Sequence, residues 1–200
     1  MIKLNEEQIK TLKEAGITAS QHSAMALSQL ICERVNIAVV KVDVVSSQDF
    51  GSIVGGTDTL GAAVYFQILG DLKGSIFLFF KRKDAIRLTD TLLYKGRGEA
   101  IMMSEMGASA LKEAGNILAA SYLSAISEIA SFRILLSVPK FVFDWAGYII
   151  DGVFGELMKE EAKAVSITTE FIESTRKIKG YFVFMPSNES LDKILQKLKN

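Results

Sequence analysis

Two long stretches of the chain repeat apolar residues at spacings of three and four, which is the pattern of an amphipathic helix with one buried face. In residues 104–132 these positions are Leu111, Gly115, Leu118, Tyr122, Ala125 and Ile129. In residues 5–33, where Asn5 provides an N-cap signal, they are Leu12, Gly16, Ala19, Ser23, Ala26 and Leu30. Leu12–Gly16 and Leu111–Gly115 also read the same letter for letter. The pattern therefore predicts two equivalent helices.

Runs of β-branched and aromatic residues between and after these helices predict strands. The strand ranges are 37–45, 62–69, 74–81, 133–137, 164–172 and 180–185, with turns at 70–73 and 173–179 and a glycine-rich, turn-like segment at 51–61. Short helices are expected at 83–93 and 188–199, and a charged linker at 94–100. The order of helix, strand, hairpin and helix occurs twice, which indicates a tandem duplication.

We therefore expect an α+β fold with internal pseudo-twofold symmetry, in which a mainly antiparallel sheet carries both long helices on one face. Residues 1–200 would form a single domain built of two repeats, 1–93 and 104–200. One segment, Pro139–Glu161, has no evident counterpart in the first half. Within it, Asp144–Met158 could form an extra helix with Trp145 and Tyr148 on a broad apolar surface. Such a helix either packs on the core or docks a partner.

Composition excludes several classes of function. Hydrophobic residues make up 49% of the 200 residues, and 23 basic residues balance 23 acidic ones. This balance gives no electrostatic reason to expect nucleic acid or an anionic membrane surface as a partner. No apolar run reaches the roughly 20 residues of a membrane span, and the N-terminus lacks the apolar segment of a signal peptide. We expect a soluble cytoplasmic protein.

The single cysteine and the single histidine carry little chemistry. Cys32 lies among apolar residues, so we expect a buried thiol in a reducing compartment. His22 has no evident acidic partner and is expected at the surface or its boundary. One His and one Cys cannot make a His/Cys metal site. The glycine-rich segment Gly51–Thr57 lacks the Lys-Ser/Thr of a phosphate-binding loop. No metal site and no cofactor are predicted.

Glu113 and Asn116 lie on the predicted outer face of the second long helix, three residues apart, so they can point at the same spot. The amide of Asn116 offers two donors and one acceptor, which suits it to hold a water molecule for attack. Phosphoryl transfer depends mostly on positioning and charge stabilisation. The alternative interpretation is an ordinary solvated pair.

Together with two further residues, this pair resembles the CheC family of chemotaxis phosphatases. The family pattern is Asp or Ser, Glu, Asn and Pro, and Ser109, Glu113, Asn116 and Pro139 meet it at every spacing. The resemblance implies dephosphorylation of the phospho-aspartate of the response regulator CheY. Asn116 would orient the attacking water, and Glu113 would pair with a regulator lysine. The regulator would bring its own Mg²⁺, so this chain would need no cofactor.

The resemblance also implies a second partner, the receptor deamidase CheD. In the family, CheD docks on the helix specific to the second half, which here matches Asp144–Met158. Asp144, Trp145 and Tyr148 are therefore expected partner-binding residues. Ser109, on the long helix, is also expected to bind a partner. One alternative function is therefore a CheD-binding module with little or no catalysis. A further alternative is a structural adaptor at the flagellar switch.

The first half departs from the family pattern. Glu14 is present, but Lys10, Ile17 and Val40 replace the Ser/Asp, the Asn and the Pro. Without an amide at Ile17, the first site should be degenerate, so we expect one working site. The apolar Ile17 and Met25 on a nominally exposed face raise the alternative that another subunit or a partner covers it.

Overall fold

The computed structural model describes residues 4–32, 34–45, 47–93, 103–157, 164–173 and 178–197. The elements of the first half are α1 (Glu6–Ile31), β1 (Val35–Val45), α2 (Ser47–Val54), β2 (Leu60–Gly70), β3 (Gly74–Lys81) and α3 (Arg82–Leu92). Those of the second half are α4 (Glu105–Ala130), β4 (Ile134–Leu136), β5 (Lys140–Trp145), α5 (Ala146–Leu157), β6 (Ala164–Glu173), β7 (Lys179–Pro186) and α6 (Asn188–Lys197). The expected linker at 94–100 lies outside the described residues.

One seven-stranded sheet runs through the described part of the chain in the order β1-β6-β7-β3-β2-β4, and β5 pairs with β2 beside β4. Each pairing between described strands is antiparallel. The two halves meet at the central pair β3–β7, while each edge strand pairs with the hairpin of the other half. The antiparallel sheet is thus confirmed, and the strand exchange interlocks the halves. The division into repeats 1–93 and 104–200 remains a prediction.

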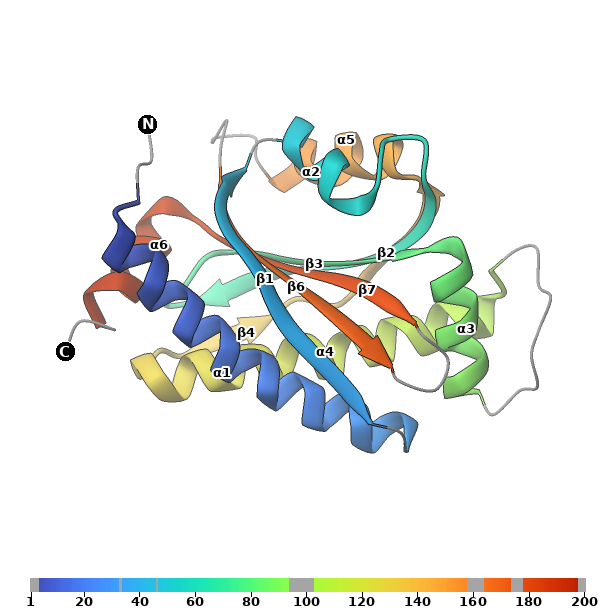
Figure 1. Cartoon of the computed structure of the whole chain (residues 1–200), viewed down its shortest axis with the longest axis horizontal. Coiled ribbons are helices and arrows are strands. Elements are labelled where there is room, and N and C mark those ends of the chain that lie inside the picture. Colours follow the sequence, from blue (N-terminus) through green and yellow to red (C-terminus); the bar gives the residue numbers. More distant parts are fainter. Residues whose placement is uncertain are drawn as a thin grey trace.

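Both long helices pack on one face of this sheet, as predicted (Figure 1). Asn5 caps the start of α1, as its N-cap signal predicted, and forms a capping box with Gln8. At the helix crossing, the buried Ser23 hydroxyl donates a 3.0 Å hydrogen bond to the Leu118 carbonyl. The predicted apolar stripe of α1 needs correction at its end, because Leu27 and Ile31 are buried there. Ala26 and Leu30 are only partly covered.

The second face of the sheet is covered by α2 and α5, which lie on the side away from α1 and α4 (Figure 1). Helix α2 was not predicted, because Gly51 and its neighbours suggested a turn. Gly51 instead lies inside the helix and close to Thr57, since an added Cβ would lie 3.2 Å from Thr57 Cγ2. The predicted helix in the second half is confirmed as α5, preceded by a strand, β5, that was not predicted.

These two elements show that Pro139–Glu161 does have a counterpart, so that part of the sequence interpretation was wrong. In the first half, β1 leads into α2; in the second, β4 and β5 lead into α5. Strand β1 shifts register between Val39 and Lys41, around Val40. In the second half, Leu136 pairs with Ile68 and Lys140 with Tyr65, so three residues ending at Pro139 oppose two. β4 and β5 therefore correspond to one bulged strand like β1.

Cys32 corrects a second expectation, because its side chain is exposed rather than buried. It follows the last residue of α1 in the left-handed conformation, with φ 54°, and Ser131 ends α4 in the same way, with φ 55°. A residue in this conformation turns the chain out of the helix axis. The apolar neighbours that suggested a buried thiol lie within the helix, whereas Cys32 lies just beyond it.

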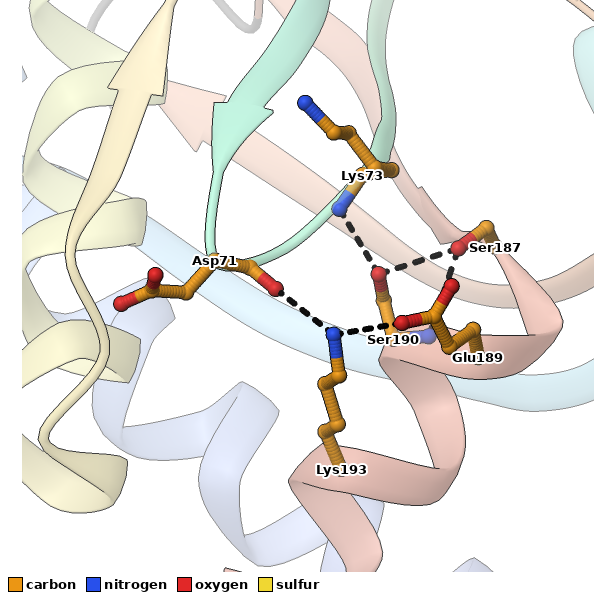
Figure 2. Close-up of polar contacts among 6 residues, drawn as sticks. All are labelled: Asp71, Lys73, Ser187, Glu189, Ser190 and Lys193. Carbon is orange, nitrogen blue, oxygen red and sulfur yellow. Dashed lines mark hydrogen bonds and ion pairs between the residues drawn. The ribbon is translucent and has the colours of Figure 1, made fainter.

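Helix α6 is bound to the turn between β2 and β3 (Figure 2). The Lys73 amide donates a 2.7 Å hydrogen bond to the buried Ser190 hydroxyl, and Lys193 Nζ lies 3.3 Å from the Asp71 carbonyl oxygen. The Asp71 carboxylate in turn accepts from the Arg133 amide at 2.8 Å, just after α4. The β2–β3 turn thus fixes α6 and the end of α4 together.

Candidate functional site

The orientation of helix α4 about its own axis is fixed by the cap at its start and by its contact with β2. Ser104 caps its first turn, accepting a 3.0 Å hydrogen bond from the Gly107 amide. Gly115 faces β2 so closely that an added Cβ would lie 3.0 Å from Val64 Cγ1. Leu111 and Leu118 are buried on the same side. Because a helix turns about 100° per residue, this packing directs the opposite face of α4 to solvent.

The residues predicted from the sequence lie on that outward face. Glu113 and Ser109 are exposed, Asn116 is half-buried, and Ala120 further along is exposed. No side-chain hydrogen bond or ion pair among the described residues involves Glu113 or Asn116. Spacings of three and four place Ser109, Glu113 and Asn116 as surface neighbours on one helix face. The structure therefore places a carboxylate and an amide side by side on the outward face of α4, next to small side chains.

Pro139, the last residue of the sequence pattern, lies in the link between β4 and β5 and not on α4. It is half-buried at the bulge where the edge strand changes its pairing. At this bulge, Ser137 forms two hydrogen bonds with Gln67 of β2. The Ser137 amide donates to the Gln67 carbonyl at 2.9 Å, and the Ser137 hydroxyl accepts from the Gln67 amide at 2.9 Å. A proline suits this place because it needs no partner for a backbone N–H.

One exposed residue of this surface was not singled out from the sequence. Met106 is 60% exposed and lies three residues before Ser109, so both share the outward face. An apolar residue in the first turn of a helix carries no sequence signal for exposure. Its exposure adds an apolar contact point at one end of the Ser109–Asn116 surface.

The equivalent face of α1 differs in charge pairing and polarity. Glu14 is exposed, but Lys10 Nζ lies 4.0 Å from its carboxylate oxygen. Ile17, at the place of Asn116, is 40% exposed, and Met25 is 58% exposed. Val40, at the place of Pro139, lies in β1 with a side chain outside the description. Neither helix therefore buries its outer face within the described chain, yet only α4 carries the amide.

Trp145 and Tyr148 lie on the other side of the sheet from Glu113 and Asn116, so the structure separates these two groups of predicted residues. Trp145 is 47% exposed and Tyr148 is 72% exposed. Asp144 is also exposed, and its carboxylate accepts a 2.7 Å hydrogen bond from the Trp145 amide.

Trp145, the last residue of β5, and Tyr148 of α5 line a surface hollow of about 440 Å³. The other lining residues are Thr57, Asp58, Gly147 and Asp151. Thr57 and Asp58 belong to the first half, and nothing in the sequence linked them to α5.

The buried side of α4 contains one polar group with an unusual environment. The Tyr122 hydroxyl has no hydrogen-bond partner among the described residues, and its ring packs against Phe182 with centroids 4.7 Å apart. Burial raises the pKa of Tyr122 above the ordinary tyrosine value. The phenol is therefore neutral and belongs to the core, and it takes no part in the outward surface.

The described residues contain no group of three His, Cys, Asp or Glu side chains placed to hold a metal ion. Within the same part of the chain, the helices are too short or too polar to span a lipid bilayer. His22 is half-buried on α1, which agrees with the boundary position expected for it.

Comparisons with known proteins match both the sequence of the site and the fold. Residues 106–143, from α4 to β5, match the model of the CheC-like family. The chain is 29% identical over 198 residues to CheY-P phosphatase CheC of Bacillus subtilis (strain 168), covering 96% of this chain and 93% of that protein.

Solved structures show the same architecture at lower sequence identity. The FliY crystal structure from Thermotoga maritima matches with a TM-score of 0.81 at 20% identity, over 99% of this chain and 98% of that one. CheX in a CheX–CheY–BeF3–Mg complex from Borrelia burgdorferi matches with a TM-score of 0.60 at 16% identity, over 90% and 99%. This chain is therefore similar to the CheC-like family in residues 106–143 and to a CheC protein over almost its whole length, and it shares the fold of FliY and CheX.

Proposed function

We propose that this chain accelerates hydrolysis of the phospho-aspartate of a CheY-type response regulator, using the outward face of α4. The observation that carries the proposal is the exposed Glu113 beside the accessible Asn116, in the segment that matches the family. The similarity to a CheY-P phosphatase of Bacillus subtilis supports it. A relative in fold, CheX, forms a complex with CheY, BeF3 and Mg.

In this proposal, Asn116 enters the regulator's active site and holds a water molecule in line with the phosphorus atom. Its amide oxygen accepts a hydrogen bond from the water, and its amide nitrogen can donate to a phosphoryl oxygen. Attack by the water forms a new P–O bond while the bond from phosphorus to the aspartate oxygen breaks. The products are inorganic phosphate and the free carboxylate. The gain comes from orientation, which is the main contribution available in phosphoryl transfer.

Glu113 is proposed to fix the regulator by pairing with one of its lysines, and Ser109 to contact it one helical turn away. A carboxylate without a partner among the described residues can form this pair without first breaking another. Mg²⁺ would be held by the regulator and would neutralise charge on the phosphoryl group. This chain would then contribute only side chains, and it would need no cofactor of its own.

The test is the decay of phosphorylated regulator, followed by loss of radioactive phosphate, with and without this chain. Wild type should shorten the lifetime of the phospho-aspartate at substoichiometric amounts, and Asn116→Ala should not. If wild type leaves the lifetime unchanged with regulators from the same cell, the phosphatase proposal is wrong.

We propose a second candidate function, docking of the deamidase CheD, on the exposed surface of Trp145 and Tyr148 with Asp144 beside them. Two large aromatic side chains exposed near one hollow are typical of a protein-binding surface. Pull-down with CheD, repeated with Tyr148→Glu, tests this function. Failure of the wild-type chain to retain CheD would contradict it. The adaptor role at a flagellar switch and the cytoplasmic location remain predictions.

A further inference from the structure

The hollow beside α5 is built from parts of both halves of the chain. Thr57 and Asp58 come from the link between α2 and β2, Trp145 is the last residue of β5, and Gly147, Tyr148 and Asp151 come from the start of α5. Helices α2 and α5 lie together on the side of the sheet opposite to α1 and α4 (Figure 1). The hollow is therefore remote from the α4 surface proposed for the regulator.

Backbone hydrogen bonds join the two sides of the hollow. The Ala146 amide donates to the Thr59 carbonyl at 2.8 Å, and the Gly147 amide donates to the Thr57 carbonyl at 2.9 Å. Gly147 allows this approach, because an added Cβ would lie 3.3 Å from both Thr57 Cβ and the Thr57 carbonyl oxygen. These bonds also satisfy the first free N–H groups of α5. The hollow is thus formed without any ligand and has a fixed base.

Its lining combines aromatic rings with negative charge. Trp145 and Tyr148 are 47% and 72% exposed, and Asp58 and Asp151 are exposed carboxylates. The lining residues include no Lys, Arg or His. Within the described chain, no ion pair involves either carboxylate. Aromatic faces attract cations, most strongly at Trp, and the planar guanidinium of Arg both stacks on rings and binds carboxylates with two hydrogen bonds.

We propose that this hollow binds an arginine side chain presented by a protein partner that docks on α5. Charge complementarity selects this occupant, because an anionic or purely apolar group would face two unpaired carboxylates. At about 440 Å³ the hollow has room for a long side chain together with adjoining backbone. The inference refines the docking surface proposed above for α5, but it does not depend on CheD being the partner.

The test uses the intact chain and a blocked pentapeptide with arginine between glycines, and its matched control is the same peptide with citrulline. Citrulline has nearly the shape of arginine but no charge. Trp145 is the one tryptophan of the sequence, so its fluorescence reports directly on the hollow. A saturable change is expected with the arginine peptide, with binding at least fivefold weaker for citrulline. Equal binding of the two peptides would overturn the proposal.

A variant pair locates the binding site. Asp58→Asn with Asp151→Asn should weaken the arginine peptide at least tenfold, while Asp192→Asn, at an exposed carboxylate on α6, should leave it unchanged. The amide resonances of Gly147 and Gly152 in NMR provide a second readout if fluorescence changes little. Unchanged binding in the double variant, or tighter binding of a glutamate peptide, would contradict the proposal. These results stand whether or not CheD is retained by the chain.

Discussion

Helices α1 and α4 have the same inner face and different outer faces. The buried residues of Leu12–Gly16 and Leu111–Gly115 fall at the same places, and both helices end in a left-handed residue, Cys32 or Ser131. On the outer face of α1, Glu14 pairs with Lys10, whereas on the outer face of α4, Glu113 has no ion-pair partner in the described chain. Ile17 occupies the place that Asn116 holds in α4. The difference shows that the scaffold and the chemistry of the two halves are specified by separate sets of residues.

Packing explains why the inner faces stay alike. Leu12 and Leu111 are each 1% exposed, and full burial of a leucine stabilises a fold by about 1.5–3 kcal/mol. Substitutions at exposed positions usually change stability by about 0.5 kcal/mol or less. An amide can therefore be lost from the position of Ile17 at almost no cost in folding. Only a partner that uses the outer face distinguishes the two helices.

The largest expected effect comes from removing both polar groups of one face. Glu113→Ala with Asn116→Ala should reduce the acceleration of regulator dephosphorylation by at least about 100-fold, the scale of losing an orienting group in a preorganised site. The matched variant, Glu14→Ala with Ile17→Ala, should change it less than about twofold, since such surface changes leave the fold intact. Phosphate release measured at equal protein concentration compares them. Similar losses in both variants would show that the faces are equivalent after all.

A smaller effect is expected from the carboxylate alone. Glu113→Gln should raise the regulator concentration at half-maximal rate by about tenfold, the scale of one charge pair across an interface, with little change at saturation. Glu14→Gln serves as the control and should alter neither quantity. Steady-state phosphate release over a range of regulator concentrations separates the two parameters. A fall at saturation without a shift in concentration dependence would assign Glu113 to chemistry rather than docking.

The comparison can also be tested by restoring the first face. Lys10→Ser with Ile17→Asn removes the partner of Glu14 and supplies the missing amide. If the two faces act independently, the rate per chain should rise by about twofold at most. An unchanged rate would mean that the amide is not sufficient, and that the proline at the bulge, where the first half has Val40, is also required.

The smallest expected effect concerns the buried side, where Tyr122 occupies the place of Ser23. The Ser23 hydroxyl has a partner at 3.0 Å, whereas the Tyr122 hydroxyl has none in the described chain. Ser23→Ala should lower the free energy of unfolding by about 1 kcal/mol, and Tyr122→Phe should raise it by about 1 kcal/mol. Urea unfolding of both variants measures these changes. A loss of stability in Tyr122→Phe would reveal a partner for the hydroxyl.

Alkaline unfolding offers a second readout for Tyr122. Burial raises the pKa of Tyr122 in the folded state above its unfolded value of about 10. The contribution of the neutral phenol to stability is therefore fully present below about pH 10. Stability should be lost as pH rises above it. Tyr122→Phe should reduce this loss, and an identical decline in wild type and variant would exclude Tyr122 as its source.

The sequence predicted the elements whose residues repeat at a clear period. The two long helices and the hairpin around Gly70 are confirmed, with bounds within two residues of those predicted, although the stripe of α1 needed correction at its end. Helix α2 was missed because Gly51 and its neighbours suggested a turn, whereas Gly51 lies inside the helix and close to Thr57 of the link that follows. Strand β5 was missed because the bulge before it breaks the alternation at Pro139.

The two candidate sites, the outward face of α4 and the hollow beside α5, also differ in how well the sequence predicted them. Glu113 and Asn116 lie three residues apart, so helical geometry alone predicted that they share a face. The hollow beside α5 joins Asp58 to Asp151 through folding, and no local pattern connects residues so far apart in the chain. Exposure of Met106 likewise depends on how the start of α4 sits against its neighbours.

The most direct test of the central claim separates docking from chemistry at Asn116. The account predicts that Asn116→Ala binds the BeF3-activated regulator with an affinity within about twofold of that of wild type. At saturating concentration, however, the variant should not accelerate dephosphorylation, so the phosphorylated regulator should decay at its intrinsic rate. Ile17→Ala, at the equivalent place on α1, should accelerate decay as wild type does. Acceleration by Asn116→Ala equal to that of wild type would contradict the account, because the two helices would then differ in sequence but not in function.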